Sequence, residues 1–230
     1  DVGRCLRSTF TVHIHSNQTK VRYLRMGASV IVSGPSGVGK GTIIARILDH
    51  FPDLHVGLSW TTRGWRPGDD EGIKRYKYVS RHEFLAAVSR GEFLEWNEHN
   101  GNLYGSWVGD DESSLREIDV QGALELHMAR PETLLIGIVP PGRTTDEQLE
   151  TLRARLSKRD SETAEEIDTR CSDALREIST IMDWWPEDNI IVNHRVDVSS
   201  SAAIQMIQAH LANSKLQKSS HPPQPNEETL

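Results

Sequence analysis

Residues 28–42 read ASVIVSGPSGVGKGT, and this stretch decides the fold. Its first five residues are mostly apolar and predict a buried β-strand, while the residues after Lys40 place apolar side chains at helical spacing: Ile43, Ile44, Ile47 and Leu48. Glycines between strand and helix let consecutive backbone N–H groups converge on one anion, and the helix start and the lysine add positive charge. A strand before the loop and a helix after it are the context that such a loop requires, so the stretch indicates nucleotide phosphate binding.

Length and composition limit the class of protein. A chain of 230 residues with 37% hydrophobic residues suits one α/β domain with insertions, or two small domains. The formal charge of −7 argues against bulk nucleic-acid binding, and ten scattered histidines without paired ligand spacing argue against a structural metal site. Two cysteines, Cys5 and Cys171, are too few for a disulfide framework, which favours a reducing compartment. No apolar run reaches the length of a membrane span, so we expect a cytoplasmic protein with neither nucleic acid nor membrane as partner.

The two ends of the chain differ in composition from its middle. Residues 1–25 carry five Lys or Arg residues and a single acid, Asp1. We expect this basic segment to be flexible. It is either an upstream extension before Met26 or an organelle transit segment. Residues 213–230 are rich in Ser, Lys, Gln and Pro, a composition that predicts a disordered tail. We therefore expect the folded part to span residues 26–212.

Strands alternate with helices along this middle part. We expect strands near residues 54–59, 114–120, 133–139 and 189–193, and helices near 121–129, 144–160, 164–182 and 200–211. Residues 60–108, rich in Trp, Gly, Arg and Tyr with one helical stretch near 81–90, have the character of an insertion that carries a binding surface. The pattern predicts an α/β fold with a parallel sheet covered by helices on both faces, and ligands at the carboxyl ends of its strands.

A second polar cluster lies at the start of that insertion. Residues 59–69 read SWTTRGWRPGD, in which Arg63 and Arg66 stand three apart beside hydroxyl residues. Guanidinium groups make bidentate contacts to phosphate, and hydroxyls complete the set. Taken alone, the spacing fits a phosphate monoester site and an ordinary solvated loop equally well.

Two further motifs decide between these alternatives. Residues 91–98 read GEFLEWNE and residues 101–106 read GNLYGS. Together with the phosphate loop and residues 59–69, they resemble the guanylate kinase family over about residues 28–212. EIDVQG at 117–122, Pro140-Pro141 and Ile191-Val192-Asn193 are also similar to the family's sequence. The resemblance implies a P-loop parallel sheet formed by residues 26–58, 114–142 and 171–212, with a small GMP-binding insertion at 59–108 and a helical lid at about 143–170.

The resemblance implies that the protein transfers the γ-phosphoryl group of ATP to GMP, and to dGMP, in purine nucleotide metabolism. The positions matching those that hold the phosphate of GMP are Ser59, Arg63, Arg66, Tyr76 and Tyr104, where one extra residue near 73–75 leaves Tyr78 an alternative to Tyr76. The positions matching those that read guanine are Glu95, Ser106 and Asp119. Guanine chemistry fits this set, because N1–H and the 2-amino group donate to a carboxylate and O6 accepts from a hydroxyl, whereas adenine reverses the roles at N1 and position 6.

On the donor side the resemblance implies ATP with Mg²⁺ as cofactor. The expected ATP contacts are Gly34, Pro35, Ser36, Gly37, Val38, Gly39, Lys40, Gly41 and Thr42, with Asn193 near the adenine. Gly41 stands where Ser or Thr usually supplies a magnesium ligand, so we expect Thr42 and Glu117 to hold Mg²⁺ through water. Lys40, Arg63, Arg159 and Arg170 would carry catalysis by positioning the phosphates and neutralising their charge, without a general base.

The segment at 107–116 departs from the family pattern. It is several residues shorter and reads WVGDDESSLR, polar and weak as a strand, although it leads into Glu117 and Asp119. This segment favours one alternative, a catalytically inactive guanylate-kinase-like module that binds a protein, while the intact loop around Lys40 argues against it. A second alternative, a kinase for another monophosphate, conflicts with the guanine-reading residues. The sequence is compatible with a monomer or a homodimer.

Overall fold

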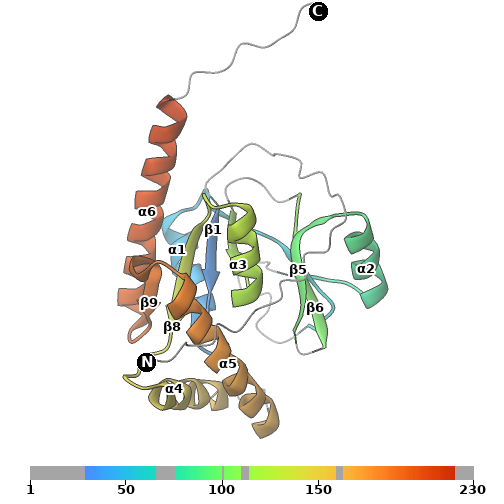
Figure 1. Cartoon of the computed structure of the whole chain (residues 1–230), viewed down its shortest axis with the longest axis vertical. Helices are drawn as coiled ribbons and strands as arrows, with labels where there is room; N and C mark the ends of the chain where they lie inside the picture. Colours follow the sequence, from blue (N-terminus) through green and yellow to red (C-terminus); the bar gives the residue numbers. More distant parts are fainter. Residues whose placement is uncertain (1–28, 66–75, 100, 110–113, 159–162, 221–230) are drawn as a thin grey trace, which may run out of the picture.

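The computed structural model describes residues 29–65, 76–99, 101–109, 114–158 and 163–220 of the chain (Figure 1). Its elements form an α/β core, a smaller sheet that carries one helix, and a pair of helices at the bottom of the view in Figure 1. No helix among the described residues is long and apolar enough to cross a membrane.

Five described strands form a parallel sheet in the order β2-β7-β1-β8-β9. Their bounds are β1 Val30–Ser33, β2 His55–Val56, β7 Ser114–Glu117, β8 Leu134–Val139 and β9 Ile190–Val192. All of β1 is buried, which explains its apolar sequence in the middle of a sheet covered on both faces. The polar segment before Glu117 nevertheless supplies β7, since Leu115 and Arg116 are buried between β2 and β1.

Helices cover both faces of this sheet, as the sequence predicts. From β1 to β2 the chain moves toward one edge of the sheet, and from β7 to β8 and on to β9 it moves toward the other edge. Because such crossovers are right-handed, α1 lies on one face of the sheet and α3 and α5 lie on the opposite face. α1 (Lys40–His50) packs against α6 (Val196–Ser220), and α3 (Val120–Ala129) packs against α5 (Ala164–Trp184). Figure 1 shows β1 between α1 and α3. A short 3₁₀ turn, Glu187–Asn189, leads into β9.

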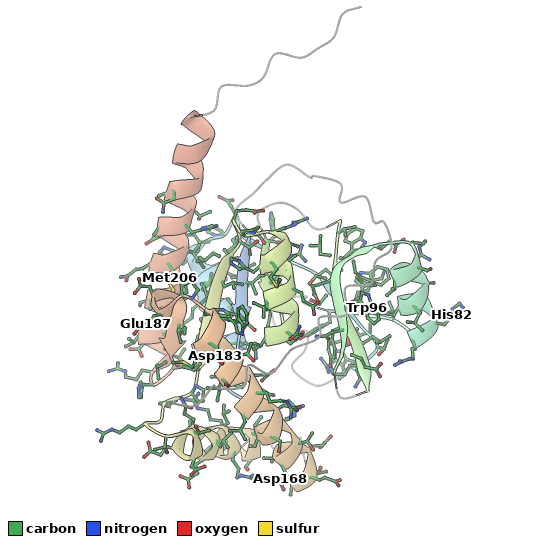
Figure 2. The ribbon with its side chains drawn as sticks, in the orientation of Figure 1. His82, Trp96, Asp168, Asp183, Glu187 and Met206 are labelled. Atoms are coloured by element: carbon green, nitrogen blue, oxygen red, sulfur yellow. The ribbon has the colours of Figure 1, made fainter. Side chains whose placement is uncertain are left out.

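The insertion forms a second, four-stranded sheet in the order β4-β3-β6-β5. Its elements are β3 Ser59–Thr61, β4 Tyr76–Tyr78, α2 Arg81–Ser89, β5 Phe93–His99 and β6 Asn102–Trp107. One face packs against α2 through a separate apolar cluster of Trp60, Phe84, Ala87 and Leu103. The ring of Trp96, labelled in Figure 2, lies 6.3 Å from that of Phe84. The insertion thus has a core of its own, and only its helix was anticipated from the sequence.

The predicted lid corresponds to α4 (Thr145–Ser157) and the first turns of α5. These segments share a small apolar cluster of Leu156, Ile167 and Cys171, whereas Ala174 and Ile181, further along α5, belong to the main core. Asp168 and Asp183, labelled in Figure 2, lie near the two ends of this helix. α5 therefore connects the lid region to the core without a break, and the division into core, insertion and lid stays a prediction.

Several predicted boundaries differ from the structure. The strand predicted near residues 54–59 is limited to His55–Val56, because Ser59 already belongs to β3 of the smaller sheet, and the helix predicted from residue 200 begins at Val196. The last helix continues to Ser220, so the disorder predicted from residue 213 is wrong for residues 213–220. These residues include no Gly or Pro and several good helix formers, which outweigh their polarity. In addition, the strand predicted for 114–120 ends at Glu117, because Asp119 caps the helix that begins at Val120. The predicted basic extension and residues 221–230 lie outside the described residues.

Candidate active site

The loop between β1 and α1 is held closely against the ends of β8 and β9. At Gly34, with φ +150°, a Cβ atom would stand 2.2 Å from the carbonyl oxygen of Ile138. Gly39, at φ +102°, forms the N-cap of α1, and a Cβ atom there would lie 2.7 Å from Nδ2 of Asn193. Both positions require glycine, and the close approach fixes the positive N-terminal end of α1 at the loop.

Lys40 folds back over this loop. Its Nζ donates hydrogen bonds to the carbonyl oxygens of Gly34 (2.6 Å) and Pro35 (3.2 Å) and lies 3.9 Å from Oε1 of Glu117. Glu117 stands at the carboxyl end of β7, paired in register with Val32 of β1. The strand register therefore brings the predicted phosphate-binding lysine and the predicted magnesium-holding carboxylate together.

Val38 connects the loop to two other segments of the chain. Nδ2 of Asn193 donates to the Val38 carbonyl oxygen (2.8 Å), and the buried Asn193 side chain also accepts from the Ser199 hydroxyl (2.9 Å). Arg155, on α4, donates to the carbonyl oxygens of Val38 (3.0 Å) and Asn193 (2.9 Å), and burial lowers the pKa of its guanidinium. Sequence reasoning missed Arg155 because it lies in a highly charged helix, where one arginine that turns inward has no distinguishing signal.

Of the two arginines predicted in the lid, the structure describes only Arg170. The guanidinium of Arg170 donates to Oγ of Ser36 in the loop, so α5 reaches the loop directly. Arg159 lies outside the described residues. Gly37 also contacts the lid, since a Cβ atom there would stand 3.0 Å from the Leu156 side chain. The loop is thus covered by residues from both α4 and α5.

The register of the smaller sheet aligns four predicted GMP-binding residues in one row. Ser59 pairs with Tyr76 on β4 and with Ser106 on β6, and Ser106 pairs with Glu95 on β5. Directly paired residues project to the same face of a sheet, so these side chains share the face opposite the α2 cluster. The next row along the strands, on the same face, contains Tyr78, Thr61, Tyr104 and Asn97.

Two carboxylates converge at the start of α3. The Ser106 hydroxyl donates to Oε1 of Glu95 (2.6 Å). A Cβ atom at Gly122 would lie 2.8 Å from Oε2 of Glu95 and 3.2 Å from Oδ2 of Asp119, so both acids approach the same glycine. Oδ1 of Asp119 accepts from the backbone N–H groups of Gln121 (3.0 Å) and Gly122 (3.1 Å), which fixes its carboxylate as the cap of the helix.

Burial raises the pKa of Glu95 to about 7. The Ser106 hydrogen bond opposes this shift, and the neighbouring charge of Asp119 adds to it. Burial likewise raises the pKa of Glu177, on α5, to about 7, with the charge of Lys40 opposing the shift. A carboxylate that has lost water in this way is stabilised in its ionised form by N–H donors from a ligand. Glu177 was not anticipated from the sequence.

Arg63 lies between two tyrosines. Its guanidinium carbon stands 5.2 Å from the ring centre of Tyr76 and 5.8 Å from that of Tyr78, and its NH1 donates to the carbonyl oxygen of Gly64 (2.9 Å). Both tyrosines therefore border this guanidinium, while Tyr76 alone of the pair lines the pocket described next. Arg66 lies outside the described residues.

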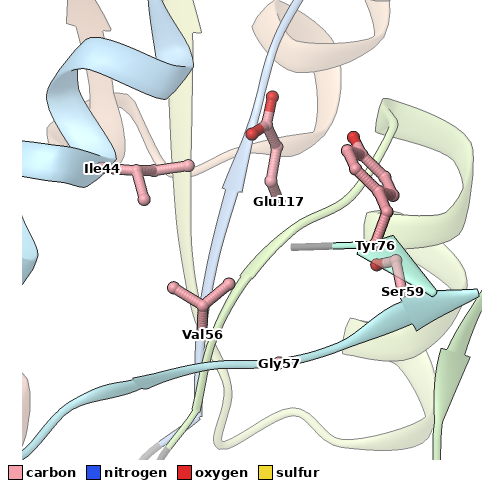
Figure 3. A pocket seen from close by; sticks show the side chains of 6 residues that line it. All are labelled: Ile44, Val56, Gly57, Ser59, Tyr76 and Glu117. Atoms are coloured by element: carbon pink, nitrogen blue, oxygen red, sulfur yellow. The ribbon is translucent and has the colours of Figure 1, made fainter. Parts of the chain in front are cut away.

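A pocket joins the core to the smaller sheet (Figure 3). Ile44, Val56, Gly57 and Glu117 line it from the core, and Ser59 and Tyr76 line it from the insertion. Because Glu117 also lies next to Lys40, the pocket connects the phosphate loop with the row of predicted GMP-binding side chains.

The residues around Lys40 fit a magnesium ion bound mainly by water and ligand phosphates. Thr42 is exposed on the first turn of α1, and Glu117 offers a carboxylate at the adjacent strand end. No group of three or more His, Cys, Asp or Glu residues that could hold a metal occurs in the described part of the chain. Mg²⁺ needs no such cluster, because it keeps several waters and commonly binds through one or two carboxylates and substrate phosphates.

A family model and curated relatives identify the family of this chain. A family model described as guanylate kinase matches residues 26–210. Similar proteins include the guanylate kinase of Lactobacillus delbrueckii subsp. bulgaricus, 38% identical over 179 residues that cover 74% of this chain and 82% of the relative. The guanylate kinase of Rubrobacter xylanophilus is 37% identical over 163 residues, covering 68% of this chain and 82% of the relative. Among solved structures, the guanylate kinase from Anaplasma phagocytophilum has a TM-score of 0.63 at 28% identity, over 87% of this chain and 98% of that one.

Proposed function

Because the chain belongs to the guanylate kinase family, we propose that it transfers the γ-phosphoryl group of ATP to GMP, giving ADP and GDP. The observation that carries this proposal is the pocket that extends from Glu117, beside Lys40, to Ser59 and Tyr76. Glu117, on one side of this pocket, lies 3.9 Å from Lys40 at the end of the loop, and Ser59 and Tyr76, on the other side, belong to a row of side chains that ends at Glu95. A donor and an acceptor nucleotide would therefore meet there.

The hydrogen-bonding groups beyond the pocket support guanine as the acceptor base. Glu95 and Asp119 offer carboxylate oxygens to N1–H and the 2-amino group, and the Ser106 hydroxyl, which donates to Glu95 here, would turn to donate to O6. Adenine has an acceptor at N1 and a donor at position 6, so it would leave a partly buried carboxylate without a donor. Sites of this kind discriminate by about 10⁴-fold or more.

The acceptor phosphate would lie at Ser59, Arg63, Arg66, Tyr76 and Tyr104. Ser59 and Tyr76 line the pocket, and Arg63, held over Tyr76, has the guanidinium fork that binds phosphate in bidentate geometry. The assignments of Arg66 and Arg159 depend on the family resemblance alone. None of these contacts uses the ribose 2′-hydroxyl, so dGMP would be accepted as well.

Phosphoryl transfer in this site would depend on positioning and charge neutralisation. The Lys40 ammonium, which bonds to loop carbonyl oxygens here, would move to the β- and γ-phosphates, and Arg170 would approach the same oxygens from α5. Thr42 and Glu117 would hold Mg²⁺ through water, and the bound ion would neutralise charge on the phosphate oxygens. Asn193, fixed to the loop at Val38, would lie near the adenine.

The test is ADP release from the purified protein with ATP and Mg²⁺, with GMP, dGMP, AMP or UMP as acceptor. We expect fast turnover with GMP and dGMP, at least about 10⁴-fold lower kcat/KM with AMP, and loss of turnover when the metal is chelated. A reaction without acceptor measures ATP hydrolysis. Tight GMP binding without turnover would contradict the proposal and favour an inactive binding module instead.

A further inference from the structure

Asn97 occupies a distinctive position next to the guanine-reading carboxylates. It lies on β5 two residues after Glu95, on the same face of the smaller sheet, and pairs with Tyr104 of β6. Its Nδ2 donates to Oδ2 of Asp119 at 2.6 Å. This hydrogen bond connects the insertion to the N-terminus of α3 in the core.

The orientation of the Asn97 amide follows from this contact. If nitrogen and oxygen were exchanged, the amide oxygen would face a carboxylate oxygen at 2.6 Å, a repulsive arrangement for an ionised Asp119. In the orientation that is present, Oδ1 of Asn97 is buried without a hydrogen-bond partner among the described residues. A buried acceptor without a partner lowers the stability of a protein by about 1–3 kcal/mol. The Asn97 side chain therefore keeps its hydrogen bond to Asp119 although its own Oδ1 makes the folded state less stable.

The bond completes the fixation of the Asp119 carboxylate. Oδ1 is held by two backbone N–H groups of α3, and Oδ2 is held by Asn97. Each carboxylate oxygen has two acceptor positions, so Oδ2 keeps one for a ligand donor. Glu95 approaches the same point, and an N–H donor on Asp119 offsets part of the repulsion between the two acids.

We propose that Asn97 is a positioning residue that holds Asp119 to receive the 2-amino group of guanine, and so makes the enzyme select GMP over IMP. The inference rests on the proposed function, since it takes Asp119 as a guanine-reading residue. IMP has the same N1–H and O6 as GMP and lacks only the 2-amino group. The contact between Asp119 and the base therefore distinguishes these two acceptors, whereas the contacts of Glu95 to N1–H and of Ser106 to O6 are available to both.

Two substitutions separate positioning from packing. Asn97→Ala removes the donor, and Asn97→Asp keeps the shape but places a carboxylate oxygen against Asp119. We expect the ratio of kcat/KM for GMP to kcat/KM for IMP to fall about 10-fold in Asn97→Ala and further in Asn97→Asp, while turnover of IMP stays nearly unchanged. The reason is that a hydrogen bond to a charged group typically changes an equilibrium or rate constant by a factor of about 10 or more. Glu98→Gln is the matched control, since Glu98 follows on the opposite face of β5 and pairs with exposed Arg81.

The outcomes are distinguishable. Equal losses with GMP and IMP would mean that Asn97 supports only the fold, and an unchanged ratio would mean that it does not act on Asp119; either result overturns the proposal. If Asn97→Asp does not fold, Asn97→Ala decides alone. If the wild-type protein phosphorylates neither acceptor, the proposed function fails. Calorimetric Kd values for GMP and IMP then test Asn97 independently. If the wild type prefers GMP and Asn97→Ala reduces this preference, the inference is supported; any other result overturns it.

Discussion

Glu95 combines a functional requirement with a cost in stability. Its carboxylate accepts from Ser106 and approaches Asp119, and burial raises its pKa from 4.5 to about 7. The ionised form is therefore poorly solvated until a ligand supplies an N–H donor, as guanine would at N1. At the residue scale, selectivity for guanine and stability of the free protein should oppose each other here.

The stability of a Glu95→Gln variant should depend on pH with a defined sign. Below about pH 4.5 the carboxyl is protonated in the folded and unfolded states, so it has no effect. Between about pH 4.5 and 7 the unfolded state loses this proton while the folded state keeps it, so stability falls, and above about pH 7 the cost of the buried charge is fully present. We expect Glu95→Gln to raise the free energy of unfolding at pH 8 by about 1–3 kcal/mol and to change it little at pH 4.5. Urea denaturation at both pH values measures this, and Glu98→Gln serves as the control. A pH-independent effect would contradict the assignment.

Activity should change in the opposite direction in the same variant. The glutamine amide keeps one acceptor but presents N–H groups where the carboxylate accepted a donor. We expect kcat/KM for GMP to fall about 100-fold. Initial rates at saturating ATP check this, and wild-type activity in the variant would exclude Glu95 from base recognition.

At the element scale, the phosphate loop depends on its close approach to β8. The loop and helix α1 are encoded locally, by an apolar strand, glycines and apolar spacing after Lys40, and the predicted helix start agrees with the structure. The smaller sheet was not anticipated, because β3 and β4 have three residues each and their alternation is too short to recognise. The register between Ser59 and Ser106 comes from pairing between distant segments, which no local pattern encodes, whereas Ser106 and Glu95 pair within the β5–β6 hairpin.

Gly34 and Gly64 offer a matched pair for testing this packing. A Cβ atom at Gly34 would stand 2.2 Å from a backbone oxygen of β8, whereas one at Gly64 would meet nothing within 4 Å. We expect Gly34→Ala to destabilise the protein by more than about 3 kcal/mol or to prevent folding, and Gly64→Ala to stay within about 0.5 kcal/mol of wild type. Chemical denaturation monitored by circular dichroism compares them. Equal stability of the two variants would show that the loop does not pack against β8 in this way.

At the scale of the whole molecule, the topology brings residues from distant parts of the chain to one place. The parallel sheet collects Lys40, Glu117 and Asn193 near the carboxyl ends of its strands, as the alternation of strands and helices predicts. The insertion then presents its polar face to the same pocket. Arg155 and Asn97 could not be found from the sequence, because their roles depend on contacts across 117 and 22 residues, respectively.

The most direct test of the account is transfer of label from γ-labelled ATP to GMP, with GDP separated by chromatography, in the wild-type protein and in Lys40→Ala. The account predicts labelled GDP from the wild type and a reduction of about 10²–10³-fold in Lys40→Ala, while Arg46→Ala, on the exposed side of the same helix, keeps wild-type activity. Absence of labelled GDP from the folded wild-type protein, or undiminished labelling in Lys40→Ala, would contradict it.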